Sequence, residues 1–307
     1  YVNEHVSVYD ASVSSNTSIS GLQWVYNSPN EKSLRFKHDD DPNTPLVITY
    51  SLTGTDSVIA DDYANGWDDE IIASRVNGSA QWEAIVDQAF AYWSDVSGIT
   101  FNKVDDNAYM NGDLRINLYS DTSGNYGGWS YVPYYFLGDN NSSANDIWIR
   151  SQYDPSTGSE YGPHILLHEI GHSLGLAHTH HDYSPPMAQN TALWSTMAYI
   201  GSSVKLLKPY DGYNVSDRIY VEQPGINDIR AIQYLYGMTP NYNHGDTTYT
   251  WTGPVYTTIY DTGGTDTIDV SGYDDLNITL DLRPSTISYI GTAEVRAEIP
   301  TGTGSND

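Results

Sequence analysis

The stretch from His168 to His178 carries three histidines and one glutamate at fixed intervals, reading H-E-x-x-H-x-x-G-x-x-H. On an α-helix, His168 and His172 are four residues apart, so their rings project from the same face, one turn apart. Two neutral imidazoles at that separation can share one zinc ion. Gly175 has no Cβ and can end the helix with a positive φ, which allows His178 to approach the metal from beyond the helix end. Glu169 is then placed to act as a general base toward water.

A purely structural role for these histidines is the alternative interpretation. The positions around them are apolar, and a single histidine in such a helix is more often a hydrogen-bonded core residue than a ligand. Five specified positions in register, however, match by chance only on the order of once in 10,000 chains of this size. The motif therefore predicts a Zn²⁺ site built from His168, His172 and His178.

Composition excludes several classes of protein. The chain has 307 residues, enough for one large domain or two of unequal size. Its net charge of −26, from 13 basic and 39 acidic residues, argues against a nucleic-acid partner. No stretch approaches the roughly 18 apolar residues of a membrane span. Cysteine is absent, so the zinc site must be built from histidine, carboxylate or tyrosine, and the surplus carboxylates suit a salt-tolerant surface or Ca²⁺ ligands.

Strand-like and helix-like segments alternate along the first 240 residues. We expect an extended N-terminal segment over 1–30 and, because of Pro133, an edge strand or loop within 127–139. This order predicts an α/β fold in which a mixed sheet is covered by a few long helices. After Pro240 the sequence consists of short strand-like segments rich in Thr, Tyr, Asp and Gly. We therefore expect a domain boundary there, between 1–240 and 241–307. The expected strands are 34–36, 46–52, 99–104, 114–118 and 146–149, and the expected helices are 79–97, one from about 162 through the zinc motif, and 226–236.

A second motif, Ser195-Thr-Met-Ala-Tyr199, has its methionine nineteen residues after the last histidine of the zinc motif. A methionine in a tight turn is by itself ordinary core filler. Downstream of the zinc motif it resembles the Met-turn of the metzincin metallopeptidases, and Tyr199 is similar to the tyrosine of serralysins and astacins. Astacins continue with Glu after the third histidine and use disulfides, whereas Thr179 stands here and cysteine is absent. Matrixins share the zinc motif but usually lack the tyrosine.

The serralysin family is therefore the one that the chain resembles, over about residues 30–290. The runs 93–101 and 226–237 are also similar to serralysin segments. The resemblance implies a metzincin catalytic domain with a mostly parallel twisted sheet. It also implies that Met197 forms a floor beneath the histidines, and that Tyr199 binds the zinc or stabilises the transition state.

The tail run Gly263-Gly-Thr-Asp-Thr-Ile-Asp269 is similar to the segment that opens the calcium-binding β-roll of serralysins. A polar turn between two strands is the alternative. The chain stops at Asp307, where the nonapeptide repeats of the family would begin, so we expect 241–307 to be a truncated, β-rich Ca²⁺-binding domain. Matching by motif gives the Ca²⁺ ligands Asn243, Gly245, Thr247, Asp261, Gly263, Gly264 and Asp266.

The resemblance implies a secreted, extracellular zinc endopeptidase that acts on proteins or peptides as a monomer, with a proteinaceous inhibitor among its partners. An extended substrate would add to the edge strand within 127–139. Two alternatives remain: a non-catalytic zinc- and calcium-binding relative, and a calcium-dependent adhesion module. The retained Glu169 argues against the first, since a structural zinc site does not need a base. His180 and His181 are loop residues or hold an additional metal ion.

Overall fold

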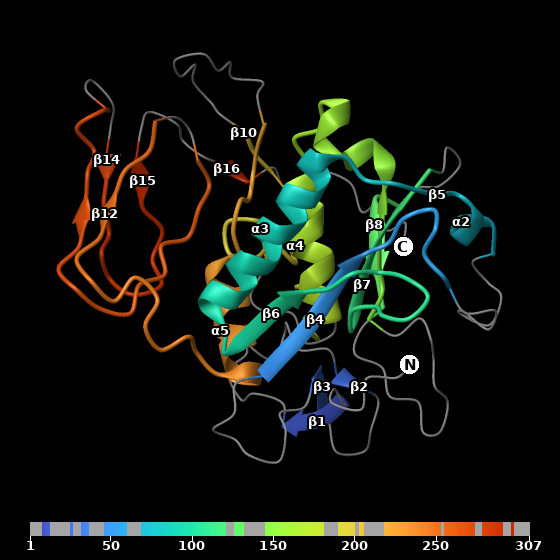
Figure 1. The fold of residues 1–307 in the computed structure, drawn as a ribbon. Coiled ribbons are helices and arrows are strands. Elements are labelled where there is room, and N and C mark those ends of the chain that lie inside the picture. The colour runs from blue at the N-terminus through green and yellow to red at the C-terminus, as the bar shows by residue number, and fades with distance from the viewer. Residues whose placement is uncertain are drawn as a thin grey trace.

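A six-stranded sheet organises the protein, and helices cover it (Figure 1). The structure is a computed structural model, and the statements below concern the residues that it describes. None of the helices in this part of the chain is long and apolar enough to cross a membrane. The described residues are 8–12, 25–26, 32–36, 46–59, 69–120, 126–131, 145–180, 190–199, 203–205, 218–252, 255–273, 278–290 and 296–297.

The central sheet has the strand order β6-β4-β7-β9-β8, and β5 pairs with β7 beside this path. Strands β6, β4, β7 and β9 run parallel, whereas β8 and β5 are antiparallel to their partners. The expected mixed, mostly parallel sheet is therefore confirmed. The bounds are β4 Leu46–Leu52, β5 Arg75–Val76, β6 Ile99–Lys103, β7 Leu114–Tyr119, β8 Gly128–Ser130 and β9 Ile147–Arg150.

Burial along the strands follows their place in the sheet. All six residues of β7 are buried, as expected for an inner strand that is covered on both faces. Strand β8 lies at the end of the order, so one of its edges faces no other strand of this sheet. The edge strand expected within 127–139 is thus found at its beginning, while 132–139 lie outside the described residues.

Two long helices pack against each other on the sheet, α3 on β6 and α4 on β8 and β9 (Figure 1). Helix α3 begins after Ser79, whose side chain accepts a hydrogen bond from the Trp82 backbone N–H at 3.0 Å. The indole of Trp93 is fully buried and donates a hydrogen bond to the Leu167 carbonyl of α4 at 3.3 Å. The helices are α2 Asp69–Ala73, α3 Ala80–Val96, α4 Gly162–Ser173 and α5 Ile226–Tyr236, with 3₁₀ turns at Ser151–Tyr153 and Pro155–Thr157.

The last residue of α5 ties three parts of the fold together. The Tyr236 hydroxyl donates to the Leu174 carbonyl at 2.8 Å and accepts from the Phe36 backbone N–H at 3.1 Å. Helix α5 ends at Gly237, whose φ of 83° lies in the region that favours glycine. The end of the zinc-motif helix is thereby joined to α5 and to the strand that contains Phe36.

Two elements differ from the sequence expectation. Residues 53–78 contain α2 and β5, neither of which is among the helices and strands expected from the sequence. A five-residue helix and a two-residue strand are too short to show a hydrophobic period. Strand β5 also owes its place to non-local pairs such as Arg75 with Tyr119. In the N-terminal segment, β1 (Val8–Ser12) and β2 (Val25–Tyr26) flank β3 (Lys32–Phe36) in an antiparallel sheet.

The chain after residue 240 forms short strands, as expected, and Figure 1 shows β12, β14 and β15 together to one side of the helices. Arg230 of α5 donates to the Ser285 hydroxyl at 2.7 Å. The division of the chain at residue 240 stays a prediction, since β16 pairs back with β10 of the preceding segment. The remaining strands are β10 Ser203–Lys205, β11 Arg218–Tyr220, β12 Thr248–Tyr249, β13 Thr267–Ile268, β14 Ile278–Thr279, β15 Tyr289–Ile290 and β16 Arg296–Ala297.

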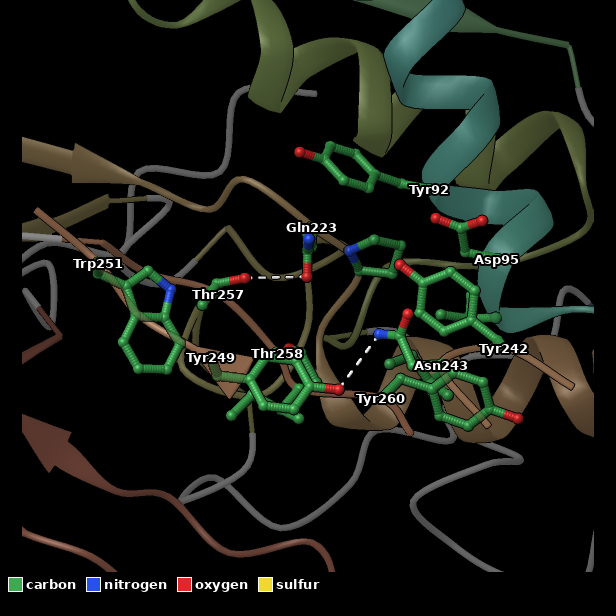
Figure 2. A pocket seen from close by; sticks show the side chains of 14 residues that line it. Tyr92, Asp95, Gln223, Tyr242, Asn243, Tyr249, Trp251, Thr257, Thr258 and Tyr260 are labelled. Atoms are coloured by element: carbon green, nitrogen blue, oxygen red, sulfur yellow. Dashed lines mark hydrogen bonds between the residues drawn. The ribbon is translucent and has the colours of Figure 1, made fainter. Parts of the chain in front are cut away.

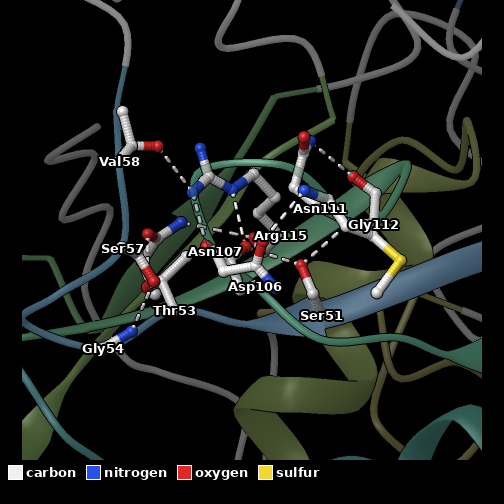
Figure 3. A network of polar contacts seen from close by, with 12 residues as sticks. Ser51, Thr53, Gly54, Ser57, Val58, Asp106, Asn107, Asn111, Gly112 and Arg115 are labelled. Carbon is white, nitrogen blue, oxygen red and sulfur yellow. Dashed lines mark hydrogen bonds and ion pairs between the residues drawn. The ribbon is translucent and has the colours of Figure 1, made fainter. Parts of the chain in front are cut away.

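A buried ion pair joins β7 to the loop after β6 (Figure 3). The Arg115 guanidinium donates to both Asp106 carboxylate oxygens, at 2.9 and 2.8 Å, and to the Val58 carbonyl at 3.0 Å. Ser51 donates to the same carboxylate at 2.7 Å. Burial by itself raises the pKa of Asp106, but the hydrogen bonds and charge of Arg115 outweigh it and hold this pKa below its usual range.

The substitution Asp106→Asn should destabilise the fold by about 3–5 kcal/mol, because it leaves the buried Arg115 cation without its counter-charge. The measurement is urea unfolding at pH 7. The pKa of Asp106 is lower in the folded protein than in the unfolded chain. Ionised Asp106 therefore stabilises the fold fully at pH values above its unfolded-state pKa, and this stabilisation is lost as the pH falls through its folded-state pKa. The control is Glu83→Gln, which breaks an exposed pair with Lys103 and should change stability by about 0–1 kcal/mol. Equal losses in the two variants would contradict the role of the buried pair.

Candidate metal centre and active site

Helix α4 carries the first two histidines and the glutamate, and all three side chains are buried. The helix ends after Ser173, and Gly175 has a φ of 95°, in the left-handed region that favours glycine. The reversal is closed by a hydrogen bond from the Leu176 backbone N–H to the Gly171 carbonyl at 2.9 Å. The chain then returns toward the helix and brings His178 to the other two imidazoles.

The three Nε2 atoms converge on one point. His168 Nε2 lies 3.1 Å from His172 Nε2 and 3.2 Å from His178 Nε2, and the latter two are 2.9 Å apart. Ligand nitrogens around a tetrahedral zinc are roughly 3.3 Å apart, so the cluster needs little adjustment to hold the ion. Among the described residues this is the one group of three or more such side chains with metal-site spacing.

Backbone carbonyls set the orientation of two of the rings. His168 Nδ1 lies 2.8 Å from the Thr196 carbonyl, and His172 Nδ1 lies 2.7 Å from the Leu176 carbonyl. Since a carbonyl can only accept, each Nδ1 carries the proton and each Nε2 presents its lone pair. Burial lowers the pKa of His168 to about 4, which keeps the ring neutral at neutral pH. These residues therefore fit Zn²⁺.

Glu169 lies beside the first ligand in a buried, apolar part of α4. Burial raises the pKa of its carboxyl to about 8, and a cation held by the neighbouring imidazoles would favour the ionised form. The charge of Glu169 also contributes to the raised pKa of Tyr161, which burial raises most. The glutamate is thus close to the cluster but makes no ion pair in the described part of the chain.

Met197 and Tyr199 lie at the cluster, on a turn that packs under α4. Met197 is fully buried, and a Cβ added to Gly171 would come within 2.6 Å of its sulfur. The methionine therefore sits directly against the backbone of the zinc-motif helix. The Tyr199 ring is half exposed, and its centroid lies 4.2 Å from that of His178 and 5.6 Å from that of His168.

Asp228 of α5 holds this turn, and the sequence did not single it out. Its carboxylate accepts from the Ser195 hydroxyl at 2.5 Å, from Thr196 N and Oγ1 at 2.6 and 2.9 Å, and from Gly225 N at 2.8 Å. Burial raises its pKa to about 6 against the effect of these hydrogen bonds. Thr196 is the residue whose carbonyl orients His168. An acidic residue in the first turn of a helix is a visible signal, but its partners on the turn, Ser195 and Thr196, lie 33 and 32 residues away in the sequence.

The residues expected to bind Ca²⁺ lie on two loops that face each other. Thr247 N donates to Asp266 at 3.1 Å, Gly263 N donates to Asp261 at 2.8 Å, and the backbone of Gly264 lies against the carbonyl of Gly245. Asn243 alone among them lines a cavity of about 130 Å³, which Tyr92 and Asp95 of α3 also line (Figure 2). Asn243 donates to the Tyr249 hydroxyl at 3.2 Å, which in turn donates to Asp261 at 2.5 Å. The assignment of Ca²⁺ to these loops stays a prediction.

The comparisons with known proteins agree with the site. The matrixin peptidase family matches residues 71–193, which include the three histidines. The chain is 28% identical to metallopeptidase AprA of Pseudomonas marginalis over 280 residues, which cover 82% of this chain and 56% of the relative.

Two further relatives are serralysins of Dickeya chrysanthemi. Serralysin A is 30% identical over 238 residues, 70% of this chain and 48% of the relative. Serralysin C is 32% identical over 236 residues, which cover 68% of this chain and 47% of the relative. The chain thus spans about half the length of the curated relatives that it matches. With the convergent histidines and the Met197 turn, these matches place the chain among the serralysin-type metzincins.

Proposed function

We propose that the protein is a zinc-dependent endopeptidase. The observation that carries the proposal is the convergence of three histidine Nε2 atoms, two of them left unprotonated by carbonyls at Nδ1, next to the buried carboxyl of Glu169. Relatives named serralysin and metallopeptidase support the same activity. A non-catalytic zinc-binding relative would not need this glutamate.

His168, His172 and His178 would hold the Zn²⁺. When bound, zinc lowers the pKa of water and polarises a carbonyl. Glu169 takes the proton from the attacking water and passes it to the leaving nitrogen of the scissile peptide. The half-exposed Tyr199 phenol donates a hydrogen bond to the oxygen that becomes negatively charged. Each of these side chains lies on α4, on the reversal that follows it or on the Met197 turn.

The substrate is a protein or peptide in extended form. Strand β8 is an edge of the central sheet, and α4 packs on it, so a substrate strand added to β8 lies next to the zinc-motif helix. Trp129 of β8 stacks on Trp148 with ring centroids 5.7 Å apart, which stiffens this edge. A net charge of −26 makes a nucleic-acid substrate unfavourable.

We also propose that the loops 243–247 and 261–266 bind Ca²⁺, through carboxylates and backbone carbonyls. Their support is the close approach of the two loops, with Asp266 and Asp246 each accepting from the opposite loop. Secretion, a monomeric state and control by a proteinaceous inhibitor belong to the same proposal and rest on the family. A calcium-dependent adhesion module would share these loops but would not cleave protein.

The substitution Glu169→Ala should retain zinc but lower the cleavage of casein by about 10²–10⁴-fold, because the water loses its base. Zinc content by mass spectrometry and initial cleavage rates are measured together. The exposed Glu160 provides the control, and Glu160→Ala should retain both properties. A cleavage rate of Glu169→Ala close to that of the wild type would contradict the role of Glu169 as the general base. Absence of cleavage by the wild type would favour a non-catalytic or adhesive role.

The substitution Asp228→Asn should weaken zinc binding by about 10–100-fold, because an amide cannot accept all four hydrogen bonds that hold Thr196 and thereby His168. Competition with a chelator at pH 7.5 measures the affinity. Asp105→Asn removes an exposed carboxylate and serves as the control. An unchanged affinity in Asp228→Asn would show that α5 does not position the ligand.

Removal of Ca²⁺ at saturating zinc should lower the melting temperature, because the ion stabilises the state that binds it. At a free Ca²⁺ concentration 100 times the dissociation constant, the stabilisation lost is about 2.7 kcal/mol. Asp261→Asn should melt lower in Ca²⁺ and respond less to its removal, whereas Asp105→Asn should respond as the wild type does. A wild-type melting temperature that is independent of Ca²⁺ would exclude the proposed sites.

A further inference from the structure

His180 adds a fourth imidazole to the metal centre, outside the zinc motif. Its ring lies parallel to that of His178, with centroids 4.9 Å apart and planes 12° apart. The same ring lies 4.9 Å from the Tyr199 ring, at 36°. His180 therefore contacts a proposed zinc ligand and the proposed oxyanion donor at once. The adjacent His181 lies outside the described residues.

Thr179 holds His180 and Tyr199 on a common anchor. Its side chain is fully buried, its hydroxyl donates to the Asn190 side chain, and its backbone N–H donates to the Met197 carbonyl at 3.3 Å. His180 follows Thr179 directly, and Tyr199 comes two residues after Met197. The rings of His180 and Tyr199 are therefore each only one or two residues from the hydrogen bond between Thr179 and Met197, and this bond holds them near each other.

The Tyr199 ring is surrounded by imidazoles on its inner side and is half exposed. In the described part of the chain, three imidazoles contact it, those of His168, His178 and His180. Two of them, His168 and His178, are proposed zinc ligands, so substituting either would also remove a ligand from the metal. His180 is not one of the three proposed ligands, so its contact with the phenol ring can be changed without removing a ligand from the metal.

We propose that His180 is a positioning residue for Tyr199, and that its ring confines the phenol against His178 in the orientation used in catalysis. The catalytic part of this inference rests on the proposed peptidase function, whereas the ring contact does not. A phenol that is already in place stabilises developing charge without reorganising at the moment of reaction. The imidazole ring is the group that we expect to act, since it lies parallel to the His178 ring and tilted against the Tyr199 ring, with centroids 4.9 Å apart in both pairs.

The first test measures the contact without any activity. Tetranitromethane nitrates exposed tyrosines, and peptide mass spectrometry isolates Tyr199 from the other tyrosines. In metal-free protein, H180Q, which lacks a ring, should nitrate Tyr199 roughly 2- to 10-fold faster than wild type, the range that an aromatic pair supports. H180F keeps a ring and should remain near the wild-type rate. Tyr109, which is 90% exposed, is the internal reference and should react equally in all three proteins.

The second test uses the zinc-loaded enzyme, with zinc content checked for each variant. H180Q should lower kcat by roughly 2- to 10-fold at unchanged KM, and H180F should stay close to wild type. In a Tyr199→Phe background, H180Q should have no further effect, because the hydroxyl that it positions is gone. An undiminished effect of H180Q in that background would overturn the proposal, as would equal nitration of Tyr199 in H180Q and wild type. An inactive wild type would refute the peptidase function, while the nitration rates would still decide the contact.

Discussion

Two backbone carbonyls, those of Thr196 and Leu176, determine which nitrogen of each α4 histidine faces the metal. An imidazole can bind zinc through either nitrogen, and rotation about its side chain would scatter the lone pairs. By accepting the Nδ1 protons, the carbonyls leave both Nε2 lone pairs directed at one point, where His178 joins them. The metal centre depends on keeping these two carbonyls in place.

The two carbonyls are held by different means. Leu176 follows the reversal at Gly175 and is fixed locally, by its hydrogen bond to Gly171. Thr196 lies on a separate turn, and Asp228 of α5 holds this turn by accepting hydrogen bonds from the backbone N–H and the hydroxyl of Thr196. A buried carboxylate is costly unless its hydrogen-bonding capacity is satisfied, and here four donors meet that condition. Helix α5 is therefore part of the metal centre although it supplies no ligand.

Packing joins these pieces to the rest of the fold. Met197 fills the space beneath α4 that the absence of a side chain at Gly171 leaves open, with Trp93 of α3 on the same side. A Cβ at Gly171 would come within 2.6 Å of the Met197 sulfur, so this side chain would have to shift. The same turn then presents Tyr199, so the ligand orientation and the place of the phenol have one structural origin. His180, anchored through Thr179 to Met197, completes this arrangement on the solvent side.

The sequence by itself determined the features that depend on local periodicity and local caps. The spacing of His168, Glu169 and His172 follows from the turn of a helix, and Gly175 follows from the need for a positive φ. Helix 226–236 and strand 46–52 were predicted at their observed bounds. The relation to serralysins could also be predicted from the sequence, because the motifs that indicate it, 168–178 and 195–199, are each contiguous.

Only the tertiary structure decided which distant groups meet. Asp228 is one acidic residue among 39 acidic residues, and nothing in its neighbourhood along the chain identifies Thr196 as its partner. The contact of His180 with Tyr199 likewise arises because Thr179 is tied to the Met197 turn. Such contacts gain their energy from shared burial and from removal of water, which depend on the packed arrangement of whole elements and leave no period in the sequence.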